Sequence, residues 1–131
     1  MNLKDKICIY PRHILIDERG WFLKLMTGSE DCLTKSFGEI YITHGNPFSV
    51  KGKHFHPIAN EWFTCIDGEA KLTLEDINTH ERMELILSSS NPQTIYVPSN
   101  IAHTFCSIND LSFTILAYAD CQYDPSDTIM Y

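Results

Sequence analysis

A chain of 131 residues, 44% hydrophobic and 21% charged, has the composition of an ordinary globular domain with its own core. Its formal net charge of −7 disfavours nucleic acid and anionic membrane surfaces as partners, because both are themselves negative. The first ten residues, MNLKDKICIY, contain no long apolar segment. We therefore expect one domain spanning residues 1–131, located in the cytoplasm, with neither a signal peptide nor a membrane span.

The cysteines number five, are widely spaced and include no CxxC pair. In a chain of this length, that pattern is typical of reduced, mostly buried thiols in a cytoplasmic protein. We expect each of them to have a structural role.

Short segments in which apolar and polar residues alternate follow one another along the chain, and no helix-period segment exceeds two turns. Turn residues such as Pro11 and the Asp17–Gly20 cluster separate the segments. The pair Asp67–Gly68 is a typical β-hairpin dipeptide. Many short strands with such punctuation indicate an all-β sandwich or barrel. The predicted strands are Lys6–Tyr10, His13–Ile16, Trp21–Met26, Glu39–Thr43, Glu61–Ile66, Ala70–Leu74, Met83–Leu87, Thr94–Val97, Ala102–Ser107 and Leu111–Ala119.

The stretch Lys51–Gly68, KGKHFHPIANEWFTCIDG, carries the densest set of reactive side chains. On a strand, residues two apart project to the same side, so His54 and His56 would enter one cavity together. Glu61 begins the next strand and can point into that cavity, and His103 arrives from a later strand. Three imidazoles and one carboxylate form a mixed ligand set suited to a divalent metal.

This arrangement resembles the two motifs of the cupin superfamily. HFH, four intervening residues, Glu61, six intervening residues and Gly68 match the first motif, apart from its leading glycine. Pro98–Asn100 followed by His103 is similar to the second motif, with Asn100 in place of a left-handed glycine. The resemblance implies a double-stranded β-helix, the cupin jelly-roll barrel.

Further segments narrow the resemblance. Asp17–Phe22 has the D-x-R-G-x-F pattern of dTDP-4-dehydrorhamnose 3,5-epimerases, and Ala119–Thr128 resembles their Y-x-P ending. Lys51–His56 (KGKHFH) and Asn60–Phe63 (NEWF) are similar to the C-terminal cupin domain of capsular polysaccharide enzymes that act on UDP-4-keto sugars. The nucleotide-sugar 3,4-ketoisomerases are the next relatives. The similarity runs from about Asp17 to the C-terminus.

The resemblance implies proton transfer next to the ketone of a dTDP- or UDP-linked 4-keto-6-deoxyhexose, as an epimerase or ketoisomerase of bacterial surface-polysaccharide biosynthesis. The keto group acidifies the neighbouring C–H bonds, so a base can remove a proton and an acid can return one elsewhere. His54 matches the base position of the epimerases, and His56 lies beside it. Tyr118 is nearest to their acid tyrosine but one residue out of register.

The resemblance also implies a stabilised enolate oxygen and no organic cofactor. A divalent metal, zinc first and otherwise iron, manganese or nickel, would serve as the Lewis acid. Its ligands would be His54, His56, Glu61 and His103. An imidazole bound to a metal is a poor base, so the two roles of His54 compete.

Candidate substrate contacts are Arg19, Lys51, Phe63 and Lys71, and the cations Arg19 and Lys51 would suit the diphosphate. Lys51 stands where the rhamnose-pathway epimerases place an arginine, and His56 where they place a glutamine. These departures disfavour double epimerisation relative to chemistry at one carbon. Because cupins commonly pair through their sheets, we expect a homodimer.

Two other interpretations stay open. A metal-dependent cupin dioxygenase or small-molecule isomerase would contain redox-active iron and would have no affinity for nucleotides. A non-catalytic sugar-binding cupin would bind its ligand without proton exchange. This last interpretation stays open because the sequence has no unambiguous acid tyrosine.

Overall fold

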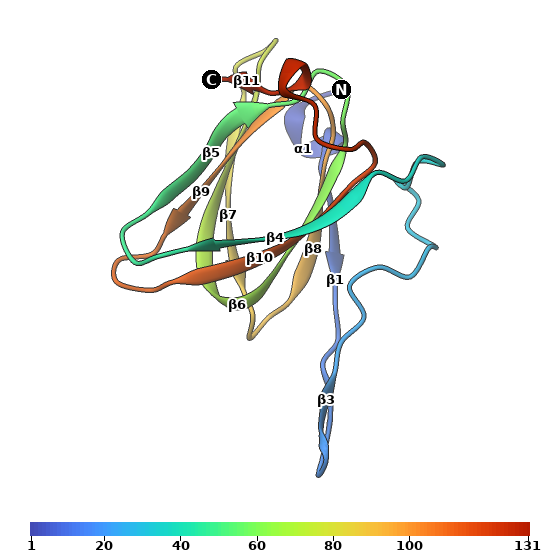
Figure 1. Ribbon diagram of the computed structural model, residues 1–131, viewed down its shortest axis with the longest axis vertical. Helices are drawn as coiled ribbons and strands as arrows, with labels where there is room; N and C mark the ends of the chain where they lie inside the picture. The colour runs from blue at the N-terminus through green and yellow to red at the C-terminus, as the bar shows by residue number, and fades with distance from the viewer.

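The computed structural model describes residues 1–131, and its regular secondary structure consists almost entirely of antiparallel strands (Figure 1). Short segments that alternate apolar and polar residues form these strands, as the sequence predicted. The elements are α1 (Leu3–Lys6), β1 (Cys8–Pro11), β2 (Leu15–Asp17), β3 (Gly20–Phe22), β4 (Glu39–Gly45), β5 (Val50–Phe55), β6 (Glu61–Asp76), β7 (Arg82–Ser88), β8 (Gln93–Val97), β9 (Ile101–Ser107), β10 (Phe113–Ala119), the 3-10 helix η1 (Pro125–Asp127) and β11 (Ile129–Met130).

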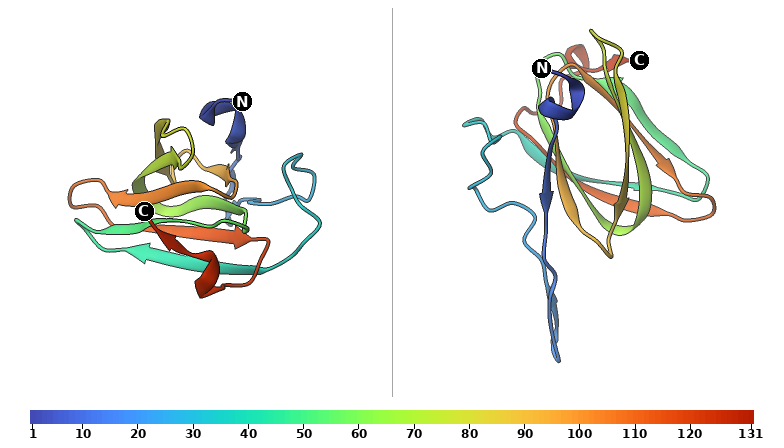
Figure 2. Two further views of the ribbon diagram at one scale, coloured as in Figure 1. Left: turned by 90° about the horizontal axis from the view of Figure 1, so that it is seen from above. Right: turned by 180° about the vertical axis from the view of Figure 1, so that it is seen from behind.

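The long strand β6 belongs to both halves of the barrel. Its first half pairs with β8 and β10, and its second half pairs with β7 and β9. Outward from these, β1 joins β8, β4 joins β10, β5 joins β9, and β11 joins β5. The sheets curve around a common interior (Figure 2). This is the cupin jelly-roll barrel, so the predicted fold class is confirmed.

Alternation along the strands decides which side chains fill the barrel. Ala70, Leu72 and Leu74 of β6 are fully buried, whereas the residues between them are partly exposed. β10 repeats this pattern along its whole length. Fifteen buried apolar residues form one cluster between the sheets, so the barrel has a continuous core.

The prediction of a hairpin at Asp67–Gly68 is wrong, because β6 continues through both residues. The pairing with β10 shifts register between Thr114 and Ile115, which marks a β-bulge. Gly68 has a φ of 77°, and a Cβ atom there would collide with the carbonyl oxygen of Ser112. A dipeptide that can close a hairpin instead lets the strand pass from one sheet to the other.

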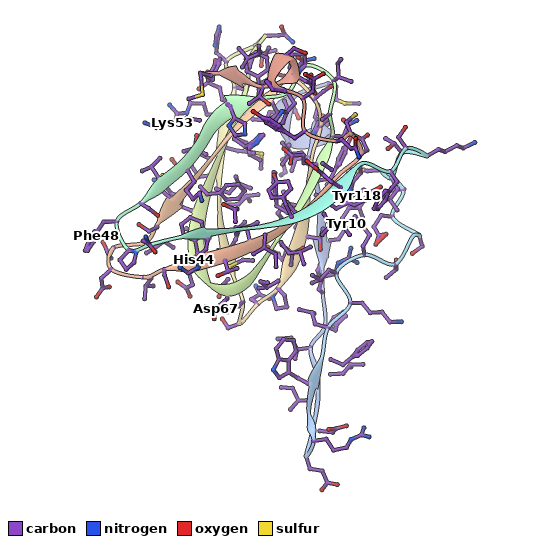
Figure 3. The ribbon with its side chains drawn as sticks, in the orientation of Figure 1. Tyr10, His44, Phe48, Lys53, Asp67 and Tyr118 are labelled. Atoms are coloured by element: carbon purple, nitrogen blue, oxygen red, sulfur yellow. A yellow bond between two sulfur atoms is a disulfide. The ribbon has the colours of Figure 1, made fainter.

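An arm formed by β2 and β3, residues 15–22, stands away from the barrel (Figure 1). The strand predicted to reach Met26 ends at Phe22, and the chain then returns to β4 without regular structure. Side chains project from both sides of the arm, clear of the barrel (Figure 3). The exposed apolar residues of β2 and β3 are Leu15, Ile16, Trp21 and Phe22, at 64%, 77%, 68% and 55%.

Cys8 of β1 and Cys32 of the loop after the arm are joined by a disulfide, and the other three cysteines are free. The expectation of reduced thiols is therefore wrong for this pair. A hydrogen bond of 2.6 Å from the Tyr10 hydroxyl to the Asp31 carboxylate helps to hold the loop against β1. None of the helices has the length and apolarity that crossing a bilayer requires.

Candidate functional site

A β-bulge in β5 directs one histidine toward another across the sheet. His54 lies opposite His103 of β9, and the register shifts between Gly52 and His54. Lys53, which has a φ of 59°, is exposed at this bulge. His56 follows the end of β5 on the same side as His54. The ring centroids of the three histidines are 4.8 to 5.4 Å apart, and one ligand nitrogen from each lies within 4.8 Å of the others.

Asn100 holds the turn that leads into β9. Its φ of 65° is the left-handed conformation that the sequence predicted. Its backbone N–H donates to the carbonyl of His56 at 2.9 Å. The turn before His103 is therefore tied directly to the chain at His56.

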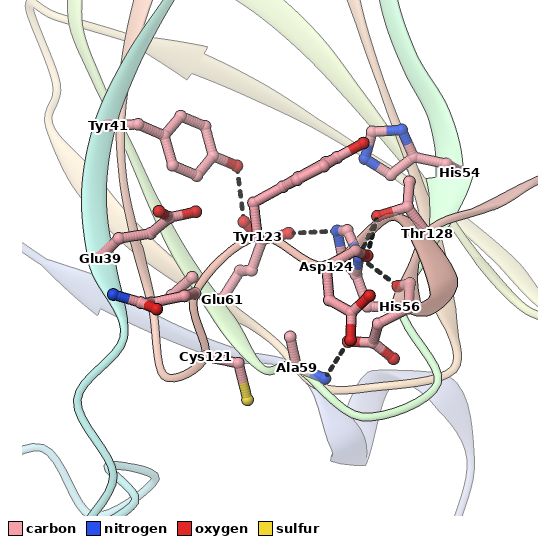
Figure 4. A pocket seen from close by; sticks show the side chains of 13 residues that line it. Glu39, Tyr41, His54, His56, Ala59, Glu61, Cys121, Tyr123, Asp124 and Thr128 are labelled. Carbon is pink, nitrogen blue, oxygen red and sulfur yellow. Dashed lines mark hydrogen bonds and ion pairs between the residues drawn. The ribbon is translucent and has the colours of Figure 1, made fainter.

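Glu61, the first residue of β6, is 3% exposed and places its carboxylate among these rings. Its Oε1 lies 2.9 Å from Nε2 of His56 and 3.5 Å from Nε2 of His103. Its Oε2 accepts a hydrogen bond of 2.5 Å from the Tyr41 hydroxyl (Figure 4). Although Oε1 is close to both rings, it is buried without an aligned hydrogen-bond donor. It is therefore available to a further ligand.

The surroundings of the three histidines shift their pKa values in different directions. Burial lowers the pKa of His103 to about 4. Burial and the neighbouring His56 lower the pKa of His54, so both rings are neutral near neutral pH. Burial opposes charge on His56, but the Glu61 carboxylate raises its pKa overall. Burial opposes charge on Glu61 too, but His56, His103 and Tyr41 lower its pKa overall, so it is ionised.

His54, His56 and Glu61 line a pocket with a volume of about 250 Å³. β4 contributes Glu39 and Tyr41 to one wall. Tyr123 points across the pocket toward His54 (Figure 4). The thirteen lining residues include neither lysine nor arginine, so a phosphate bound here would need a cation from elsewhere. The segment after β10 forms the other wall with Cys121, Gln122, Tyr123, Asp124, Asp127 and Thr128.

Tyr118, predicted to be catalytic, lies outside this pocket. Because side chains alternate along β10, Ala117 and Ala119 face inward and Tyr118 faces outward. Its ring packs against Trp62, with 5.2 Å between centroids, and its hydroxyl donates to the carbonyl of Ser36 at 3.1 Å. The predicted catalytic position of Tyr118 is therefore corrected. The residue is one position out of register, so its side chain points to the outer face of β10.

The four predicted substrate contacts also lie outside the pocket of a single chain. Arg19 is on the arm and pairs with Asp17 at 2.7 Å. Lys51 donates to the carbonyl of His44 at 3.1 Å. Lys71 faces Glu84 at 3.9 Å on the outer surface, and Phe63 is 1% exposed in the core beneath His103. Alternation along β6 turns Phe63 into the core and Lys71 to the outer surface, and Arg19 lies on the protruding arm.

The structure adds Tyr41, Tyr123 and Asp127 to the site. Tyr41 lies on the predicted strand Glu39–Thr43, and alternation along that strand is the sequence signal that could place its side chain in the pocket. Tyr123 and Asp127 follow the last long strand, and the Y-x-P ending was the only sequence signal for them. Their position depends on how the tail folds back over the barrel.

The fold and the histidine cluster define a cupin. Residues 15–131 match the family model of the polysaccharide biosynthesis C-terminal domain, and the chain belongs to that family. No curated protein matches the sequence. The predicted resemblance to capsular polysaccharide enzymes and sugar-nucleotide epimerases is confirmed at the level of family and fold.

Several solved structures share this fold. A dTDP sugar isomerase from Desulfovibrio desulfuricans has a TM-score of 0.86 at 17% identity, covering 95% of this chain and 83% of its own. The epimerase RmlC from Legionella pneumophila, in complex with dTDP-4-keto-L-rhamnose, has a TM-score of 0.86 at 18% identity, covering 98% and 74%. The capsular polysaccharide assembling protein CapF from Staphylococcus aureus has a TM-score of 0.67 at 23% identity, covering 92% and 34%.

Proposed function

We propose that the chain is an epimerase or isomerase of a nucleotide-linked 4-keto-6-deoxyhexose in bacterial surface-polysaccharide biosynthesis. The observation that carries this proposal is a neutral histidine, His54, at a pocket that His56 and the buried Glu61 carboxylate also line, with His103 beside Glu61. The structurally similar RmlC from Legionella pneumophila binds dTDP-4-keto-L-rhamnose in its crystal structure. The family to which the chain belongs supports the same pathway.

In this proposal His54 is the base. A neutral imidazole can take a proton from the carbon beside the ketone, and the lowered pKa keeps the ring neutral. Tyr123 points toward His54 from the opposite wall, so its phenol can return a proton to the other face of the same carbon (Figure 4). The hydroxyl of Tyr41 is bound to Glu61 and that of Tyr118 to Ser36, so neither competes with Tyr123 for this role.

His56, His103 and Glu61 would hold a divalent metal. The orphaned Oε1 of Glu61 lies 2.9 and 3.5 Å from the two Nε2 atoms, and nitrogen and oxygen donors of this kind suit zinc. When bound, the metal would act as a Lewis acid on the keto oxygen. Glu61 contacts His56 and His103 rather than His54, which supports leaving His54 free as the base.

The exposed arm is the reason to include a homodimer in the proposal. A two-stranded hairpin with four exposed apolar side chains is marginal by itself, so we propose that it packs against another copy in a homodimer. The same contact would bring Arg19 to a pocket that has no cation of its own. Arginine suits the diphosphate because its planar fork binds two phosphate oxygens.

The homodimer predicts a specific loss of assembly. Replacing Ile16 and Trp21 together by serine removes two apolar side chains from the arm, and we expect the protein to become monomeric in sedimentation equilibrium. Ile86→Ser is the matched control, because Ile86 is 57% exposed on β7 and outside the arm. A wild-type monomer, or a double variant that dimerises as well as the control, would contradict the proposed interface.

Solvent deuterium exchange tests the function itself. We expect the purified protein in D₂O to place deuterium at C3 or C5 of a dTDP- or UDP-linked 4-keto-6-deoxyhexose. NMR measures the incorporation against a protein-free control. Removing metal with a chelator should slow this exchange, and adding zinc should restore it. Exchange at the protein-free rate with both nucleotides would refute the epimerase and isomerase together. Exchange that is unchanged in demonstrably metal-free protein would refute the metal alone.

A further inference from the structure

Asp127 connects the C-terminal tail to the histidine cluster through three hydrogen bonds. It ends the 3-10 helix η1 and is 7% exposed. Its carboxylate oxygens accept from the backbone N–H groups of Ile58 and Ala59 at 2.8 and 3.0 Å. Its backbone carbonyl lies 2.8 Å from Nδ1 of His56. A single residue thus contacts both the ring of His56 and the turn that follows it.

The contact with the carbonyl fixes the hydrogen on the imidazole. A carbonyl oxygen only accepts, so Nδ1 of His56 is the donor and carries a proton. In the neutral ring, Nε2 then presents its lone pair, and this is the atom that lies 2.9 Å from Glu61. A backbone carbonyl behind a ligating histidine sets both its tautomer and its ring orientation.

We propose that Asp127 is a positioning residue, which holds the tail so that its own carbonyl orients His56 toward the metal centre. The carboxylate is needed because both of its oxygens accept from backbone N–H groups. Asparagine would turn an NH₂ group toward Ile58 or Ala59, donor against donor, and the tail would have to move. The carbonyl that binds His56 would move with it. The metal half of this inference rests on the proposed function.

Asp120 provides a matched control. It is 6% exposed, and its carboxylate accepts from the backbone N–H of Asn60 at 2.8 Å, in the same turn between β5 and β6. It also accepts from the Asn60 side chain and from the Thr34 hydroxyl, and it contacts no histidine. Asp120→Asn and Asp127→Asn therefore remove the same charge at the same depth and disturb the same turn.

The experiment compares both asparagine variants and Asp127→Ala. Titration with Zn²⁺ alone, against a competing chelator, should show affinity reduced by roughly 10- to 100-fold for the Asp127 variants. Asp120→Asn should bind zinc like the wild type, even if its melting temperature falls. In the metal-free proteins, ¹⁵N NMR of the histidines at a pH high enough for the His56 ring to be neutral should show a fixed Nδ1–H tautomer for His56 in the wild type and in Asp120→Asn, and a mixture of tautomers in the Asp127 variants.

The two readouts separate this inference from the proposed function. If zinc affinity and the His56 tautomer in folded Asp127 variants equal those of Asp120→Asn, the positioning role is wrong. If the wild type binds no zinc, the metal half of the proposed function is wrong, and the tautomer alone then decides the role of Asp127. Retention of the fixed tautomer in Asp127→Ala would overturn it, and loss of the fixed tautomer would support it.

Discussion

His54→Gln should lower the rate of deuterium incorporation beside the ketone by about 10²- to 10⁴-fold, which is the usual contribution of a positioned base. Glutamine keeps a polar side chain of similar reach but cannot take a proton near neutral pH. The burial and the neighbouring His56 that lower the pKa of His54 keep it ready for this step in the wild type. Exchange is read by NMR under the conditions used for the wild type.

Tyr123→Phe should separate the two halves of the same reaction. With the base intact, deuterium should still enter the substrate, but delivery to the opposite face should slow, so exchange persists while inversion falls. Tyr118→Phe is the control for losing a phenol outside the pocket, because the Tyr118 hydroxyl is bound to the carbonyl of Ser36. Wild-type exchange in His54→Gln would contradict the base. Wild-type inversion in Tyr123→Phe would contradict the acid.

Gly68→Ala should cost the fold roughly 2–5 kcal/mol. About 1–2 kcal/mol comes from forcing a side chain into a left-handed conformation, and about 1–3 kcal/mol from the overpacking against the backbone of Ser112. β6 is paired with β10 before this bulge and with β9 after it, so no neighbouring loop can relieve the strain. The free energy of unfolding from urea titration measures the loss.

Gly28→Ala isolates the two contributions. Gly28 has a similar φ of 84°, but a Cβ atom there would meet no other atom within 4 Å. Alanine at position 28 should therefore show only the conformational part of the loss. If Gly68→Ala is no more destabilising than Gly28→Ala, the close approach of β6 to Ser112 does not limit the barrel.

The histidine cluster could be predicted because its spacing is local. A spacing of two residues on a strand places His54 and His56 on the same side. The cupin motif added Glu61 and His103, and it requires no knowledge of how the loops fold. Asn100 was predicted to be left-handed because few residues other than glycine adopt that conformation. Alternation also predicted most strands, since it reflects one face packed on a core.

Features that depend on partners distant in the sequence could not be predicted in this way. Asp67–Gly68 suits a hairpin and a bulge equally, and only the strand opposite decides between them. The far wall of the pocket forms when the tail packs back on the barrel, so Tyr123 and Asp127 had only the Y-x-P ending to suggest them. Arg19 lies on an arm that stands away from the barrel, and no local pattern in the sequence indicates that position.

The buried carboxylate oxygen of Glu61 has a consequence for engineering this protein. Keeping a carboxylate and its imidazole neighbours away from water costs free energy, and well-packed apolar replacements of buried charged groups are often neutral or stabilising. Selection for heat resistance alone would thus favour replacing Glu61 and the rings around it early. A thermostability library from this chain should therefore hold these positions constant. Otherwise the most stable variants will keep the barrel and lose the side chains of the candidate site.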